Sequence, residues 1–108
     1  MINYDDFKKV EMKIGKVLSA ERVEGSEKLL KLFVDFAEEN PRQVISGIGK
    51  YFENLENIIG KQYAFVTNLE PRSIMGFESQ AMIIAASTDT AIAFFNTTED
   101  IPPGTLLK

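Results

Sequence analysis

Alternation of hydrophobic and polar positions dominates the chain and predicts strands. Val10, Met12 and Ile14 alternate with charged residues at the start of a segment that runs to Val23. Such a pattern is typical of a strand with one buried face. The alternation changes phase after Gly15, and a glycine at a phase change indicates a bulge or sharp bend, which a small closed barrel requires. Alternation or apolar runs predict four further main strands at 30–36, 42–48, 62–69 and 79–87.

The segments between these strands contain turn-forming residues and one candidate helix. Segments 37–41 and 70–76 are predicted to be loops, and 50–59 is the one stretch able to form a short helix, which Gly60 ends. The fifth strand is apolar throughout, so we expect it to be buried on both faces. Short additional elements are expected as a helical turn after Asn3 and strands at 91–95 and 105–107.

Five main strands with a helical interruption between the third and fourth are the element order of an OB-fold. The sequence therefore predicts an all-β chain: a five-stranded OB-type barrel with a short helix between strands 3 and 4 and extra C-terminal strands. The 108 residues suit one domain, 1–108, and 44% of them are hydrophobic, which is enough for a core. A domain of this size leaves much surface uncovered, so a partner subunit would help to stabilise it.

The residue types that are missing exclude most enzymatic chemistry. The chain contains no cysteine and no histidine. Their absence removes disulfides, thiol catalysis, Ser-His triads and the commonest metal ligands. The acidic pairs at 5–6, 38–39 and 99–100 are neighbours in expected turns or helix starts, where a solvated surface is the favoured interpretation. We therefore predict a non-catalytic protein with no cofactor and no metal.

The net charge of −4 argues against nucleic-acid binding when it is taken alone, because phosphate contacts need Lys and Arg. Nine of the twelve basic residues lie in the first sixty positions, but so do eleven of the sixteen acidic ones. Any basic surface must therefore be assembled in three dimensions. No apolar run is long enough for a membrane helix, and the acidic N-terminus lacks the features of a signal peptide. We expect a cytoplasmic location and no membrane partner.

Two segments are candidates for ligand contacts. The run from Ser46 to Lys50 has two glycines before its lysine, but the Walker spacing is absent, so it indicates only a strand end where a ligand could approach the backbone. Arg72 follows Pro71 in a predicted loop, where its guanidinium could fork onto a phosphate. An ordinary turn with a surface arginine is the alternative. Met82 is by default a core residue.

Four blocks in this order resemble the tRNA-binding domain family, whose members include the C-terminal domain and β-subunit of methionyl-tRNA synthetases and stand-alone bacterial tRNA-binding proteins. The blocks are 23–29 (VEGSEKL), 42–48 (RQVISGI), 68–72 (NLEPR) and 76–86 (GFESQAMIIAA). The resemblance implies an OB-fold, a homodimer and tRNA binding that depends more on shape than on sequence, with no catalytic step. The partners it implies are tRNA, a second copy and a methionyl-tRNA synthetase catalytic subunit. Whether the chain is a stand-alone protein, a subunit or a C-terminal domain stays open.

The resemblance also implies a set of RNA-binding residues. Lys28 and Lys50 would contact phosphate near the mouth of the barrel, and Arg72 would grip the RNA backbone beside Asn68. Ser46, Ser79 and Met82 would line the same face. The structural alternatives are that the serines only close turns and that the methionine belongs to the core. The chain departs from the family at Ala81 and Ala37, where glycine is usual or frequent.

A peptide-binding chaperone similar to CsaA, on the same fold, is the alternative function. The blocks around 68–72 and 79–82 match the tRNA binders better. Competition between tRNA and an unfolded polypeptide would separate the two functions.

Overall fold

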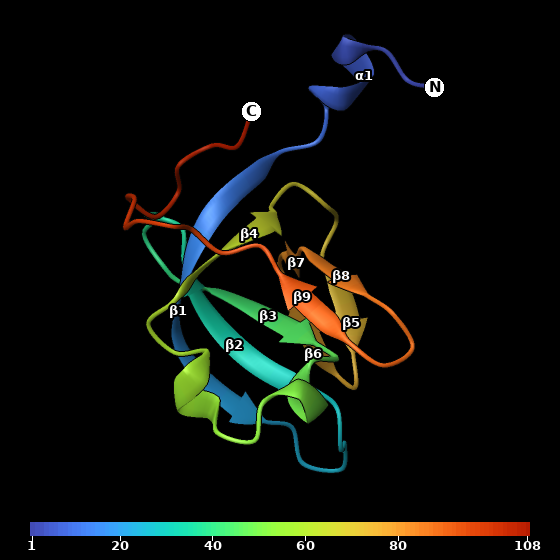
Figure 1. Cartoon of the computed structure of the whole chain (residues 1–108), viewed down its shortest axis with the longest axis vertical. Coiled ribbons are helices and arrows are strands. Elements are labelled where there is room, and N and C mark those ends of the chain that lie inside the picture. The colour runs from blue at the N-terminus through green and yellow to red at the C-terminus, as the bar shows by residue number, and fades with distance from the viewer.

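The computed structural model describes all 108 residues and contains a five-stranded antiparallel sheet that curls into a nearly closed barrel (Figure 1). The strand order in the sheet is β3-β2-β1-β4-β7. The predicted all-β fold with an OB-type barrel is therefore confirmed. The five strands are β1 (Met12–Arg22), β2 (Leu30–Asp35), β3 (Arg42–Ser46), β4 (Gln62–Val66) and β7 (Met82–Ile83).

The barrel is closed by polar contacts between β3 and the residues that precede β7. The amide of Gln80 donates to the carbonyl of Gln43 at 2.8 Å, and the side-chain oxygen of Gln80 accepts from the amide of Gln43 at 2.8 Å. The hydroxyl of Ser79 accepts from the amide of Ile45 at 3.0 Å. Side chains thus replace part of the hydrogen-bond ladder that a fully closed barrel would have.

Shorter elements surround the barrel. The α1 helix (Tyr4–Phe7) stands clear of it at the end where both chain termini lie (Figure 1), and Asn3 caps α1 by accepting from the amide of Asp6 at 2.8 Å. None of the helices is long and apolar enough to cross a membrane. The other elements are the hairpin of β5 (Arg72–Ile74) and β6 (Phe77–Ser79), the hairpin of β8 (Ala85–Ser87) and β9 (Ile92–Phe94), and the 3-10 turns η1 (Gly49–Tyr51) and η2 (Leu55–Asn57).

The core follows from the alternation in the sequence. In β2, Leu30, Leu32 and Val34 point inward and are fully buried, whereas the residues between them are only partly buried. Gly15 is required by close packing, because a Cβ there would lie 2.5 Å from Cγ1 of Val34 and 2.6 Å from Cε1 of Phe36. The irregularity in the pairing of β1 and β2 lies between Val17 and Ser19, so the predicted bulge exists but falls after Gly15.

The helical segment predicted at 50–59 between β3 and β4 is present, but it forms the two short 3-10 helices η1 and η2 rather than one continuous helix. Asn54 interrupts it by accepting from the amide of Glu56 at 3.0 Å, which starts η2 rather than continuing η1. Ile58 is fully buried in this segment, and Phe52, Leu55 and Ile59 are partly buried against the core. The residues Tyr51 and Leu55 are exposed or half-buried.

The single fifth strand predicted at 79–87 is wrong. It is divided among the end of β6, the whole of β7 and β8, and β8 is exposed along its length. The division follows from the contacts of Gln80 with β3, which turn the chain away from a straight strand. Part of the loop predicted at 70–76 is the strand β5, and at 105–107 the sheet gains only a bridge between Lys13 and Leu106. Ala37 adopts a positive φ of 61°, which explains why glycine suits this position.

Candidate nucleic-acid interface

A shallow groove of about 90 Å³ lies where β3, β5 and β7 meet. Four of the seven residues predicted from the sequence line it: Ser46, Arg72, Ser79 and Met82. The structure therefore brings together residues that are up to 36 positions apart in the chain. The remaining lining residues are Ile45, Leu69, Glu70, Ile74, Ala81 and Ile83.

Arg72 is the free cation of this groove. It lies in β5 opposite Ser79 and is exposed, and its side chain takes part in none of the hydrogen bonds or ion pairs within the chain. Glu70 lines the same groove without pairing to it. A guanidinium with no internal partner keeps all five donors for a ligand, and its planar fork suits a phosphate.

Met82 and Ser79 have different surroundings in the groove. Met82 is 47% exposed, so it is not a core residue, and its side chain offers apolar surface beside Arg72. Ser79 is buried, and its hydroxyl accepts from the amide of Ile45 while lying 3.2 Å from the carbonyl oxygen of Ala81 as a donor. The closure of the barrel thus engages the hydroxyl of Ser79. Ser46 is half-buried at the end of β3.

Lys28 and Lys50 lie together just beyond the end of the β2–β3 pair, where Ser46 pairs with Leu30. Both lysines are exposed and take part in no ion pair, and the amide of Gly49, which precedes Lys50, donates to the carbonyl of Lys28 at 2.7 Å. A Cβ at Gly49 would approach that carbonyl oxygen to 2.9 Å. The two lysines therefore lie close in the fold to the Ser46 end of β3 but do not line the groove.

Arg22 holds this lysine pair in place, and no pattern in the sequence indicates it. Its guanidinium donates to the carbonyls of Gly49, at 3.0 Å, and Phe52, which fixes the η1 turn that carries Lys50. These carbonyls are 27 and 30 positions away in the chain, so no local pattern could have identified the contact. The charge of Arg22 is satisfied by backbone rather than by a carboxylate.

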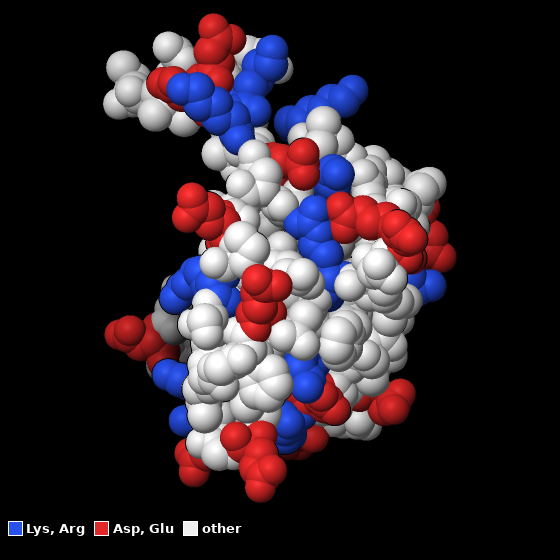
Figure 2. Space-filling model, turned by 180° about the vertical axis from the view of Figure 1, so that it is seen from behind, with Lys and Arg blue, Asp and Glu red and all other residues white.

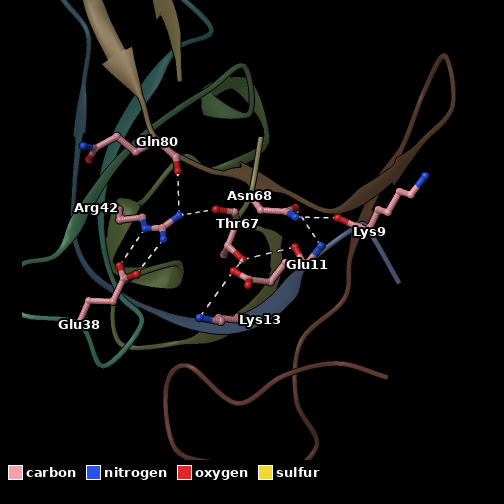
Figure 3. A network of polar contacts seen from close by, with 8 residues as sticks. All are labelled: Lys9, Glu11, Lys13, Glu38, Arg42, Thr67, Asn68 and Gln80. Carbon is pink, nitrogen blue, oxygen red and sulfur yellow. Dashed lines mark hydrogen bonds and ion pairs between the residues drawn. The ribbon is translucent and has the colours of Figure 1, made fainter. Parts of the chain in front are cut away.

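Asn68 does not line the groove. Its side-chain amide nitrogen donates to the carbonyl of Lys9 at 2.7 Å, and its side-chain oxygen accepts from the amide of Glu11 at 2.8 Å (Figure 3). Asn68 instead lines a larger depression of about 540 Å³ at the other side of the loop, between α1 and the C-terminal residues. The structure thus separates the side chains of Asn68 and Arg72, although only three residues lie between them in the chain.

A polar network adjoins Asn68 and uses several of the basic residues internally (Figure 3). Arg42 forms a forked ion pair with Glu38 at 2.7 and 2.8 Å and donates to the carbonyls of Thr67, at 2.6 Å, and Gln80, at 3.1 Å. The hydrogen bond from Arg42 lowers the pKa of the Glu38 carboxyl. The hydroxyl of Thr67 donates to Glu11 at 2.7 Å and thereby lowers the pKa of that carboxyl.

Ion pairs with carboxylates reduce the number of basic side chains that are free to bind a ligand. Lys9, Lys13, Lys31 and Arg42 are paired with carboxylates. Basic and acidic side chains are interspersed over the face shown in Figure 2, with several basic ones near the end where the termini lie. The positive charge available near the groove therefore comes from Lys28, Lys50 and Arg72.

Comparisons with known proteins agree with this geometry. Residues 12–106 match a family model described as "Putative tRNA binding domain". Methionine–tRNA ligase from Lactococcus lactis is 40% identical over 107 residues, which are 98% of this chain but 16% of the ligase. The chain therefore spans about a sixth of the length of such relatives.

Two solved structures resemble the whole chain. The crystal structure of a MetRS-related protein from Pyrococcus horikoshii has a TM-score of 0.90 and 35% identity, covering 100% of this chain and 98% of that one. The chaperone CsaA from Bacillus anthracis has a TM-score of 0.87 and 27% identity, covering 100% and 99%. The fold alone thus accommodates proteins with different names and leaves the choice of ligand to the residues of the groove.

Proposed function

Since the chain belongs to the tRNA-binding domain family, we propose that it binds tRNA without catalysis and that recognition depends on the shape and backbone of the RNA more than on its sequence. The family assignment confirms the prediction of a small binding domain rather than an enzyme. The observation that carries the proposal is the unpaired guanidinium of Arg72 at the edge of a partly apolar groove. We place this activity in the cytoplasm.

Each part of the groove has a role in this proposal. Arg72 forks onto a phosphate, and Lys28 and Lys50 contact further phosphates along the same strand of RNA. Met82 and Leu69 provide apolar surface for a sugar or base, and Ser46 provides a hydroxyl. Because most of these contacts go to backbone atoms, they carry little sequence information.

Arg72→Ala tests the proposal directly. The affinity of this variant for tRNA, measured by mobility shift at two salt concentrations, should fall about 10-fold to 150-fold at low salt, because a charge-assisted hydrogen bond contributes about 1.5–3 kcal/mol. The slope of log affinity against log salt should become shallower by about 0.7–0.9 for each phosphate that the variant no longer neutralises. Circular dichroism should show an unchanged fold, because the side chain of Arg72 makes no internal hydrogen bond or ion pair.

Lys16→Ala is the matched control. It also removes one exposed positive charge, but from a separate depression that contains Asp35 and Asp100. Its affinity and salt slope should stay close to those of the wild type. If Arg72→Ala bound tRNA as tightly as Lys16→Ala did, the groove would not be the RNA-binding site.

We propose that the protein acts as a homodimer, joined through the arm, which we define as residues 1–10. The arm carries exposed apolar side chains, and α1 buries none of its residues. A helix of four residues is not stable in water without packing. The depression beside it is lined by apolar residues from the arm and the C-terminus: Tyr4, Phe7, Val10, Leu106 and Leu107.

A second copy fits this surface because the arm both projects from the barrel and lines the depression beside it. A two-fold axis would place the apolar side of one arm in the depression of the other, so that each contact is made twice. The surface carries Asp5 and Asp6 in α1, and Lys8 and Lys108 line the depression, so groups of both signs are present for contacts between two copies. Two sites in one particle also raise the overall affinity for a large RNA.

Sedimentation at micromolar concentration tests the dimer. The wild type should sediment as a dimer and Phe7→Ser, which places a hydroxyl in the apolar contact, as a monomer. A monomeric wild type would contradict the dimer without affecting the groove.

The larger context follows from the relatives. We propose that the chain serves as the C-terminal domain or β-subunit of a methionyl-tRNA synthetase or as a stand-alone protein that binds tRNA. A peptide-binding role like that named for CsaA is the second candidate, favoured by the apolar walls of the groove. An unfolded polypeptide that displaced tRNA in competition, with equal weakening of both ligands in Arg72→Ala, would support that role.

A further inference from the structure

The side chains of Thr67 and Asn68 contact the N-terminal segment, whereas the residues that follow them contact the groove. These two side chains hold the chain at Lys9 and Glu11, next to the arm. Among the residues that follow, Leu69, Glu70 and Arg72 line the proposed RNA-binding groove. Six consecutive residues thus connect the proposed dimer surface with the proposed RNA site.

The attachment to the arm side is made by five hydrogen bonds, one of them a longer bond of 3.3 Å from the hydroxyl of Thr67 to the carbonyl of Glu11. The side chain of Asn68 bonds to the carbonyl of Lys9 and the amide of Glu11, as described above. Thr67 adds its amide, which donates to the carbonyl of Glu11 at 2.9 Å, and its hydroxyl, which donates to the Glu11 carboxylate (Figure 3). We call Thr67 and Asn68 together the clasp.

The clasp is also connected to the opposite wall of the groove. Arg42 donates to the carbonyl of Thr67 in the clasp and to the carbonyl of Gln80, which directly precedes Ala81 and Met82 of the groove (Figure 3). One guanidinium therefore fixes both walls relative to the clasp. Pro71 further restricts the loop between the clasp and Arg72.

We propose that Asn68 is a positioning residue of the clasp, which couples packing of a second copy against the arm to the placement of Arg72 in the groove. The inference rests on the proposed function and replaces a direct RNA contact for Asn68. A side chain whose donor and acceptor groups already bond to backbone has little capacity left for RNA. Because coupling is reciprocal, dimerisation strengthens tRNA binding and tRNA strengthens the dimer beyond the effect of having two sites.

Hydrogen exchange without RNA tests the coupling. Exchange of the segment 69–79, followed by mass spectrometry, should accelerate about threefold to tenfold in Asn68→Ala and also in Phe7→Ser, as removal of one or two hydrogen bonds would produce. Asn54→Ala is the matched control, because it removes an equally exposed capping asparagine at η2 and should leave 69–79 unchanged. Unchanged exchange in Phe7→Ser, with sedimentation showing that its dimer has dissociated, would overturn the proposal.

A double-mutant cycle shows whether the coupling reaches the RNA. The cycle compares the loss of tRNA affinity caused by Phe7→Ser in two backgrounds, the wild type and Asn68→Ala. The loss should be about threefold to tenfold greater in the wild type, because the clasp is already broken in Asn68→Ala. A direct contact from Asn68 to RNA predicts the same factor in both backgrounds, and that result would overturn the proposal. Asn68→Asp, which keeps the acceptor for Glu11, should restore part of the coupling if the variant folds.

The outcomes separate this inference from the function on which it rests. Unchanged tRNA affinity in Arg72→Ala would refute the RNA site, whereas the exchange experiment would still report on the clasp. A protein that binds tRNA through Arg72 but shows additive effects in the cycle has the RNA site and lacks the coupling.

Discussion

Gly15→Ala is the substitution for which the packing of the barrel gives the clearest expectation. A methyl group at Gly15 would lie 2.5 Å from Cγ1 of Val34 and 2.6 and 2.9 Å from two ring carbons of Phe36. Favourable contacts between carbons are about 3.5–4.0 Å, so the overlap is about 1 Å. Val34 is fully buried, and Phe36 packs edge-on against Phe65 with ring centroids 5.2 Å apart. Neither neighbour can withdraw without disturbing the core.

The expected cost follows from two opposing terms. Overpacking of a well-packed core costs about 1–3 kcal/mol. Replacing glycine by alanine lowers the entropy of the unfolded chain and returns about 0.4–1 kcal/mol where the backbone conformation permits it, as it does here, since φ at Gly15 is not positive. The free energy of unfolding should therefore fall by about 1–2 kcal/mol.

Thermal unfolding followed by circular dichroism measures this change, at equal protein concentrations because a dimer dissociates on dilution. The midpoint should fall by about 5–15 °C for a chain of this size. Gly47→Ala is the matched control, because nothing lies within 4 Å of its added Cβ and its φ is not positive, and its stability should change by about 0.5 kcal/mol or less. A Gly15→Ala protein as stable as Gly47→Ala would refute the close approach of β1 to β2 residues in the core.

Two further predictions concern pH. The hydrogen bond from Arg42 lowers the pKa of Glu38 in the folded state, and the hydrogen bond from Thr67 lowers that of Glu11. The two carboxylates therefore stabilise the fold above their ordinary pKa of 4.5. This contribution should be lost as the pH falls through the folded pKa values. Glu38→Gln should lower the free energy of unfolding at pH 7 by about 0.5–1 kcal/mol, as for a partly exposed ion pair, and urea titrations from pH 7 to 3 should show a shallower acid dependence than in the wild type; equal acid slopes would contradict this. Burial raises the pKa of Tyr63, so its contribution is present below the ordinary value of 10.0 and should be lost as the pH rises through the folded value, which Tyr63→Phe should prevent in the same titration at alkaline pH.

The order of strands and the class of chemistry are already set by the residue pattern and composition. The alternation of apolar and polar residues in β2 correctly predicted which side chains are buried. Successive residues of a strand point to opposite faces, so burial of one face produces this alternation in the sequence. The absence of cysteine and histidine removed thiol catalysis, Ser-His triads and the commonest metal ligands from the expected chemistry. Four motif blocks in order then indicated the family, and Ser46, Arg72, Ser79 and Met82 do meet at one groove.

The sequence pattern failed where one segment contacts several others. The apolar run at 79–87 has the pattern of one buried strand, but Gln80 pairs with β3 while Met82 and Ile83 pair with β4. The hydrophobic pattern of a segment shows which of its residues are apolar, but it does not show which strand each residue pairs with. The same limitation explains the two 3-10 turns in place of one continuous helix at 50–59.

Which polar groups are free for a ligand depends on the folded arrangement. Asn68 and Arg72 stand four positions apart in the chain, and both were predicted to contact RNA. The fold brings backbone partners from 57 and 59 positions away to Asn68, and it leaves the guanidinium of Arg72 without any. Hydrogen-bond partners come from distant segments, so the availability of a polar side chain is a property of the folded chain, whereas its chemical type is a property of the sequence.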